Sequence, residues 1–133
     1  MVEHSTRSWA SKLAAGVAVV FGVLTILSGG QALFGSAAMR DAAGDAVPFV
    51  LWFNFLSGFF YILAGIGIAM GRRWAARMAV YIAFAIAAVF ALLGLHIWQG
   101  GAFEMRTVGA MTLRLIVWII VATVAVRNFP MAR

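Results

Sequence analysis

The side chains best suited to chemistry lie close together in the second half of the chain. His96, Glu104, Arg106 and Arg114 fall in and after the stretch Leu95-His96-Ile97-Trp98-Gln99-Gly100-Gly101. Histidine is the residue type that exchanges protons near neutral pH, and guanidinium groups bind carboxylates and phosphates. Glu104 is expected to pair with Arg106 or Arg114, or to be solvated. These residue types suit anion binding or proton transfer, and no catalytic motif accompanies them.

The composition indicates that lipid, not water, surrounds most of the chain. Of 133 residues, 65% are hydrophobic and 11% are charged, and the mean hydropathy is +1.02. A soluble domain carries roughly 25% charged residues. The absence of cysteine excludes disulfides and thiolate metal sites. The net charge of +6 is assigned to basic residues that flank membrane helices, so no nucleic-acid partner is expected.

Four apolar stretches are long enough to cross a bilayer. They cover residues 13–34, 48–70, 78–98 and 107–126, and about 20 helical residues span the roughly 30 Å of hydrocarbon. The first stretch is too long for a signal-peptide core of about 7–15 residues, so we expect it to be a retained helix. The short basic turn before the third stretch favours an antiparallel hairpin. The predicted fold is therefore an all-α membrane domain covering residues 1–133, an antiparallel four-helix transmembrane bundle.

Small residues recur at helical spacing in the first three spans and let neighbouring helices approach closely. The three predicted stripes are Ala18-Gly22-Thr25-Gly29, Asn54-Gly58-Tyr61-Gly65 and Ala79-Ala83-Ala87-Ala91. At the helix ends, Pro48 fits a first turn with Asp45 as its cap, and Gly100 fits a left-handed terminus.

The distribution of basic residues predicts the orientation. Both termini and the middle turn belong to one side of the membrane, and this side holds seven of the ten basic residues: Arg7, Lys12, Arg72, Arg73, Arg77, Arg127 and Arg133. The positive-inside rule places this side in the cytoplasm. In a bacterial host, the protein would then lie in the inner membrane with His96–Arg106 facing the periplasm.

Depth places several polar residues in one layer beneath the outer surface. Asn54 lies about 9 Å and Arg114 about 10 Å along their helices from the outer ends, and helical side chains lean toward the helix amino terminus. The candidate ligand-binding residues are Asn54, His96, Glu104 and Arg114, with Gln31 and Trp118 as secondary members.

Arg114 is the most informative of these residues, and it has two interpretations. An arginine at the centre of a membrane helix costs roughly 2.5–3.5 kcal/mol on insertion scales. One interpretation is that its long side chain reaches the headgroups unaided. The other is an anion-binding or proton-coupled site in a cavity, with the ring of Trp118 facing the guanidinium.

No metal site is expected. Haem ligation by His96 needs a second axial ligand, and the other histidine, His4, is predicted on the opposite side of the membrane. Methionines such as Met105 and Met111 commonly fill gaps in apolar helices, which disfavours a copper site. No cofactor is predicted, and a quinone is the one considered.

The middle third of the chain resembles the DoxX-like group of small four-helix membrane proteins. The resemblance is carried by Leu56-Ser57-Gly58, Ala64-Gly65-Ile66-Gly67 and Gly71-Arg72-Arg73-Trp74-Ala75-Ala76. It implies a glycine-bearing second helix, a short basic turn and an alanine-rich third helix. Some members of that group are linked to quinone-dependent sulfur oxidation, so the resemblance bears on architecture more than on activity.

Two functions are consistent with these features. The first is an accessory or structural subunit of a membrane assembly, with a protein partner or further copies of itself and no catalysis of its own. Short loops and the lack of a complete catalytic set favour this function. The alternative is a redox partner that binds quinone or lipid headgroups, or a small transporter, with a polar site under the outer surface.

Overall fold

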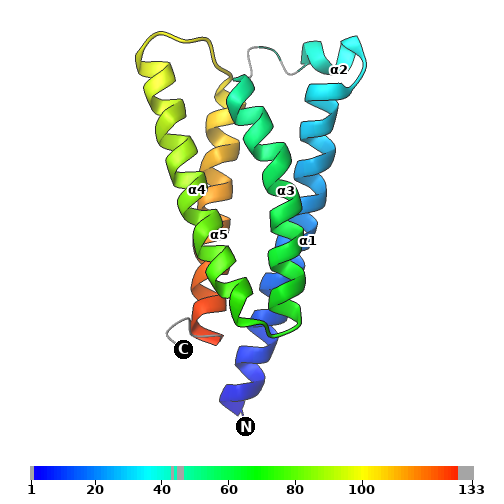
Figure 1. The fold of residues 1–133 in the computed structure, drawn as a ribbon, viewed down its shortest axis with the longest axis vertical. Helices are drawn as coiled ribbons and strands as arrows, with labels where there is room; N and C mark the ends of the chain where they lie inside the picture. Colours follow the sequence, from blue (N-terminus) through cyan, green and yellow to red (C-terminus); the bar gives the residue numbers. More distant parts are fainter. Residues whose placement is uncertain (1, 43, 45–46, 129–133) are drawn as a thin grey trace.

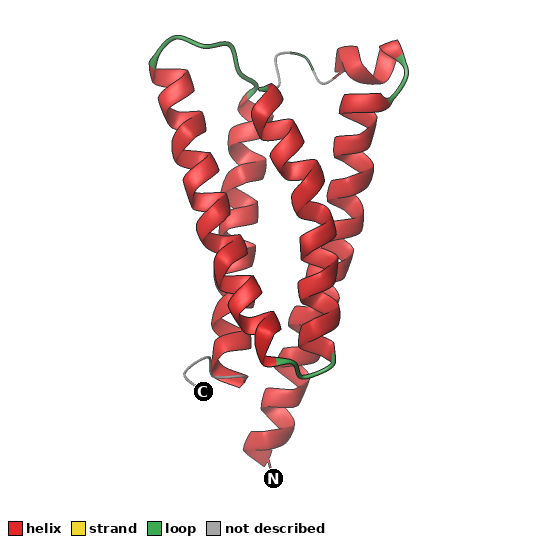
Figure 2. Cartoon of the chain, in the orientation of Figure 1, coloured by secondary structure: helices red, strands yellow, loops and turns green. Residues whose placement is uncertain are grey.

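The computed structural model describes residues 2–42, 44 and 47–128, and helices make up most of this part of the chain. The elements are four long helices and one short one, in the order α1 (Val2–Phe34), α2 (Ala37–Ala42), α3 (Pro48–Ala69), α4 (Arg73–Trp98) and α5 (Met105–Asn128) (Figures 1 and 2). The four long helices are each long and apolar enough to cross a membrane. The prediction of four apolar membrane helices is confirmed.

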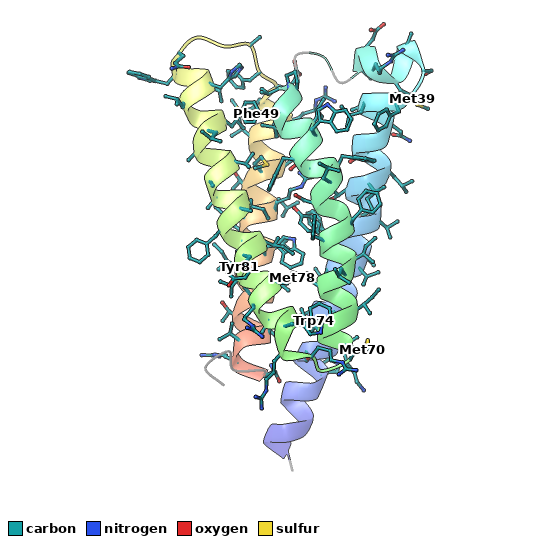
Figure 3. All side chains as sticks on the ribbon, in the orientation of Figure 1. Met39, Phe49, Met70, Trp74, Met78 and Tyr81 are labelled. Carbon is teal, nitrogen blue, oxygen red and sulfur yellow. The ribbon has the colours of Figure 1, made fainter. Side chains whose placement is uncertain are left out.

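The outer surface of the bundle is apolar along all four long helices. Leu24 of α1, Phe59 of α3, Phe84 of α4 and Ile120 of α5 are each at least half exposed, and side chains project outward from every long helix (Figure 3). Exposed apolar surface of this extent is stable in lipid but not in water. The chain is therefore an integral membrane protein whose helices contact the bilayer.

Figure 1 shows where the connections lie. The start of α1 and the end of α5 are at one end of the bundle, and the turn between α3 and α4 is near them. The α1–α3 connection, which contains α2, and the α4–α5 connection are both at the opposite end. We call this opposite end the loop end.

Three helices begin earlier than the hydropathy predicted. α1 begins at Val2 because helical backbone continues through the polar segment around Lys12, although its membrane-length part is Trp9–Phe34. α4 begins at Arg73, so most of the predicted basic turn is helical; arginine and alanine are good helix formers. α5 begins at Met105, two residues before the predicted start. The short helix α2 was not predicted.

Both α3 and α4 end at a glycine with positive φ, and the glycine at the end of α4, Gly100, was predicted from the sequence. Gly71 has a φ of 72° and Gly100 a φ of 87°. After each, a backbone N–H returns to the last turn of the helix: Arg72 donates to the Gly67 carbonyl and Gly101 to the His96 carbonyl, both at 2.9 Å. This pairing satisfies carbonyls that the helix end leaves free. Pro48 occupies the first turn of α3, as predicted, and the predicted cap Asp45 lies outside the described residues.

α1 and α3 make the most extensive contact in the bundle, and the small residues predicted from their spacing lie in it. A Cβ on Gly22 would lie 2.7 Å from the Gly58 carbonyl oxygen, and a Cβ on Gly65 would lie 2.9 Å from the Ala15 carbonyl oxygen. Side chains at these positions would force the helices apart. Thr25 of α1 and Asn54 of α3 line one cavity beside this contact.

The alanine stripe of α4 is only partly the packing face that was predicted. Ala79 is buried, but Ala83 and Ala87 are half-buried and Ala91 is exposed. From its middle onward, the buried face of α4 instead uses larger side chains: Ile82, Ile86 and Leu93. These larger side chains bridge the wider separation between α4 and its neighbours, which alanines could not do.

Candidate functional site

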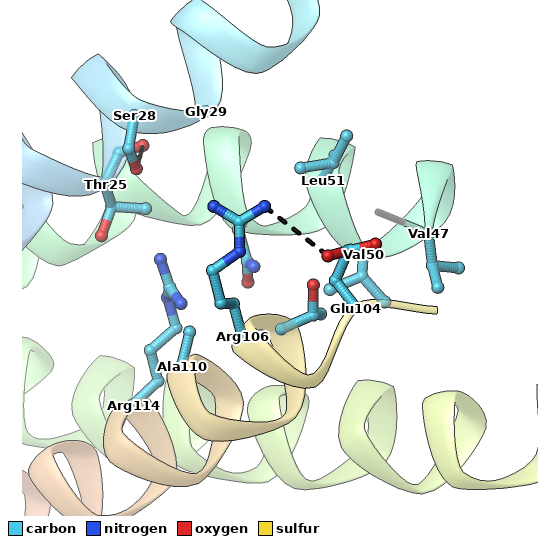
Figure 4. Close-up of a pocket in the computed structure, with 12 residues that line it drawn as sticks. Thr25, Ser28, Gly29, Val47, Val50, Leu51, Glu104, Arg106, Ala110 and Arg114 are labelled. Carbon is cyan, nitrogen blue, oxygen red and sulfur yellow. Dashed lines mark hydrogen bonds and ion pairs between the residues drawn. The ribbon is translucent and has the colours of Figure 1, made fainter. Parts of the chain in front are cut away.

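A cavity of about 240 Å³ lies between α1, α3 and the start of α5, toward the loop end (Figure 4). Its polar side chains come from three helices and the loop before α5. We call it the α1–α3–α5 cavity and define it by its polar lining: Thr25, Ser28, Asn54, Glu104, Arg106, Thr107 and Arg114. Apolar residues such as Val50 and Ala110 complete the wall.

Arg114 lies inside the bundle, not on its lipid-facing surface. Its side chain is only 9% exposed, and it extends from α5 toward α1 (Figure 4). The guanidinium carbon lies 5.8 Å from the centre of the Phe21 ring on α1, which is within cation–π range. The predicted ring contact from Trp118 is therefore made by Phe21 instead. No carboxylate in the described part of the chain forms an ion pair with Arg114.

Arg106 holds the rim of the cavity together. Its guanidinium donates to the Ala42 carbonyl at the end of α2, at 2.8 Å, and lies 3.6 Å from the Glu104 carboxylate. The pairing of Glu104 with Arg106 is one of the arrangements predicted from the sequence. Arg106 is largely exposed. From the start of α5 it contacts both the end of α2 and the loop before α5 at the mouth of the cavity.

Asn54 reaches the cavity from α3 and is 8% exposed. Its Oδ1 atom and the Nε atom of Arg114 are both buried and lack a hydrogen-bond partner among the described residues. A buried polar atom without a partner costs about 1–3 kcal/mol. The two atoms belong to residues of one cavity lining, Asn54 on α3 and Arg114 on α5.

Beneath the cavity, polar atoms continue into the core. Tyr61 and Trp118 are fully buried, with ring centres 4.8 Å apart. The Tyr61 hydroxyl lies near the Arg114 guanidinium and near Ser57, yet neither the hydroxyl nor the Trp118 N–H makes a direct hydrogen bond within the described structure. Trp118 packs against Tyr61 in the core and does not line the cavity.

His96 is placed apart from this group. Its Nε2 atom lies 2.9 Å from the Ala102 carbonyl, and its ring packs edge-on against Phe49 at 6.2 Å. The ring also lies directly over Gly101, where a Cβ would collide with it. His96 thus fastens the α4–α5 connection and does not line the cavity.

The structure brings together part of the predicted set. Asn54, Glu104 and Arg114 meet at the cavity, whereas Gln31 is exposed on α1 outside its lining. Sequence reasoning underrated Arg106 and did not assign Thr25 and Ser28 to the site. Thr25 was named only as a packing residue, and its polar hydroxyl in a stripe of glycine and alanine was the available signal.

The chemistry of the lining favours an anion. Two guanidinium groups and one carboxylate give the wall a surplus positive charge, and hydroxyl and amide groups add hydrogen-bond donors. In the described residues, no group of three His, Cys, Asp or Glu side chains is arranged to hold a metal ion.

The chain matches no protein-family model, no curated protein and no solved structure. The fold and the cavity together define a small integral membrane protein with four membrane-length helices and a cationic cavity.

Proposed function

We propose that this protein binds an anionic group in the α1–α3–α5 cavity. We also propose the topology predicted from the sequence: an antiparallel bundle in a bacterial inner membrane, with both termini in the cytoplasm and the loop end at the periplasmic face. The observation that carries the proposal is the buried guanidinium of Arg114, which faces the cavity without a carboxylate partner in the described structure.

The energetic argument concerns charge burial. A charge removed from water is strongly destabilising unless another charge or several hydrogen bonds compensate it. The Phe21 ring supplies part of this compensation, because a cation–π contact contributes about 0.5–2 kcal/mol. An anion between Arg114 and Arg106 would supply the remainder and would pair with the positive charge that Glu104 leaves uncompensated.

The proposal assigns binding and no chemical conversion. A quinone remains the alternative ligand suggested by the DoxX-like resemblance, and its carbonyl oxygens would accept hydrogen bonds from the same donors. The cavity holds two guanidinium groups and one carboxylate, so it favours an anionic ligand more than a neutral quinone. Retention and transport of the bound anion are both compatible with this arrangement.

The test is native mass spectrometry of the protein released gently from membranes, with its bound molecules retained. We expect a discrete anionic adduct on the wild-type chain and its loss in Arg114→Leu. Arg40→Leu is the matched control, because Arg40 is exposed on α2 at the same end and does not line the cavity. An identical adduct on Arg114→Leu, or bare wild-type protein, would overturn the proposal.

An accessory role in a larger assembly is the second candidate. It is favoured by α4, which exposes Tyr81, Phe84, Leu92 and Trp98 and is flanked on both sides by apolar grooves. The same mass spectra report on it. Masses at multiples of 14.3 kDa, or a second polypeptide, would support an assembly, and a stable lone monomer would count against it.

A further inference from the structure

A second concave feature lies on the same pair of helices as the anion cavity. It is a groove of about 280 Å³ between α1 and α5, nearer the termini. All the residues that line it are apolar, among them Leu13, Ala14 and Val17 of α1 and Val117, Ile120 and Val121 of α5. We call it the α1–α5 groove.

On α1, the residues that line the groove and those that line the cavity lie on the same face of the helix. On α1, the steps from Val17 to Phe21, Thr25 and Ser28 are three or four residues each, so these side chains share one face of the helix. Val17 lines the groove, Thr25 and Ser28 line the cavity, and Phe21 lies between them.

The same alignment holds on α5. Val117 lines the groove, and Arg114, Ala110 and Arg106 follow toward the cavity at intervals of three or four residues. One seam between α1 and α5 therefore has a cationic cavity at the loop end and an apolar groove toward the termini.

We infer that the ligand is an amphiphile with a phosphate headgroup, whose headgroup enters the α1–α3–α5 cavity and whose single apolar tail lies along the α1–α5 groove. This inference rests on the anion-binding proposal and extends it to the ligand class. Apolar seams between membrane helices are normally covered by lipid tails. Here the cationic cavity at one end of the seam favours an amphiphile whose headgroup carries negative charge.

The donor set favours phosphate over a carboxylate. A carboxylate offers two oxygens, and a single arginine fork satisfies both. The cavity presents two guanidinium groups together with the hydroxyls of Thr25 and Thr107 and the amide of Asn54. Donors on several walls suit the three or four oxygens of a tetrahedral phosphate.

The lengths also agree. From Thr25, the residue of α1 in the cavity that is nearest the groove, to Val17 at the near end of the groove, α1 advances about 12 Å at 1.5 Å per residue. One leaflet contributes about half of the roughly 30 Å of hydrocarbon in a bilayer. A tail that starts at the cavity and has the length of one leaflet therefore reaches the groove.

The experiment compares three related probes on the full-length protein in a neutral maltoside detergent. They are 1-oleoyl lysophosphatidic acid, which has the headgroup and the tail, glycerol 3-phosphate, which has the headgroup alone, and monooleoylglycerol, which has the tail without phosphate. Binding is measured by titration with native mass spectrometry. We expect lysophosphatidic acid to bind about 100-fold or more tighter than either partial probe, because tail burial adds to headgroup pairing.

Variants assign the two contacts separately. Ile120→Trp fills the groove and is expected to weaken lysophosphatidic acid binding about ten-fold while leaving glycerol 3-phosphate unaffected. Leu92→Trp is the matched control, since Leu92 is exposed on α4 outside this seam. Both positions face outward, and size-exclusion profiles check that the variants remain folded.

The outcomes separate the two proposals. Equal binding of glycerol 3-phosphate and lysophosphatidic acid, or no effect of Ile120→Trp on a folded protein, would overturn the tail assignment and leave the anion site standing. If neither phosphate probe binds, or if monooleoylglycerol binds as tightly as lysophosphatidic acid, the phosphate amphiphile is the wrong ligand class. The anion site then stands only if the wild-type chain still carries an anionic adduct that Arg114→Leu loses.

Discussion

At the residue scale, the cavity depends on a few polar groups whose surroundings the sequence only partly reveals. The position of Arg114 within an apolar helix marked it as exceptional, and its depth followed from helix geometry. Whether its side chain turned toward lipid or toward the bundle depended on the rotation of α5, which hydropathy does not define. The structure turns it inward, against Phe21.

His96 shows the opposite outcome at the same scale. Its depth suggested that it would join Asn54 and Arg114, but a nearby carbonyl in its own loop holds the ring. Gly101 makes this possible, because a side chain at that position would occupy the space of the imidazole. A local hydrogen bond of this kind depends on loop conformation, which residue spacing does not predict.

Replacing Arg114 with methionine is expected to stabilise the ligand-free protein. The guanidinium is buried without a carboxylate partner in the described structure, and exchanging buried charges for apolar groups of similar volume often stabilises proteins by about 1–4 kcal/mol. Thermal unfolding in maltoside detergent should therefore shift upward, while anion binding is lost. A marked loss of stability would show instead that Arg114 is needed by the fold itself.

At the element scale, the α1–α3 contact was the most predictable part of the packing. Residues four apart along a helix share a face, so the glycines of the two spans formed visible stripes, and the structure places Gly22 against Gly58. The alanine stripe of α4 was less informative. Alanine permits close approach but does not require it, and α4 packs through Ile82, Ile86 and Leu93 where the helices diverge.

Gly22→Ala should destabilise the bundle by about 1–3 kcal/mol, as overpacking does in tightly packed cores. Its Cβ would lie 2.7 Å from both the Gly58 carbonyl oxygen and Ile62 Cγ1. Gly16→Ala is the control on the same helix, because nothing lies within 4 Å of a Cβ there. Thermal unfolding of both variants in the same detergent measures the difference. Equal behaviour would mean that α1 and α3 are not held at this close separation.

At the scale of the whole molecule, the number and rough extent of the membrane helices followed from hydropathy alone, since long uncharged segments are what a bilayer requires. The cavity did not follow in the same way. It depends on how three helices diverge toward the loop end, and on Arg106 reaching the Ala42 carbonyl of α2, a helix that was not predicted. Contacts between segments far apart in sequence need the fold before they can be placed.

The predicted orientation can be tested directly, because the chain contains no cysteine. Gln99→Cys lies at the end of α4 at the loop end, and Met70→Cys lies at the α3–α4 turn near the termini; both positions are exposed. With seven basic residues predicted on the cytoplasmic side, Gln99→Cys should react with a membrane-impermeant maleimide in intact spheroplasts. Met70→Cys should react only after the membrane is permeabilised. The reverse pattern would place the cationic cavity at the cytoplasmic face, where its phosphate ligand would come from the inner leaflet, and labelling of both from one side would contradict the bundle topology.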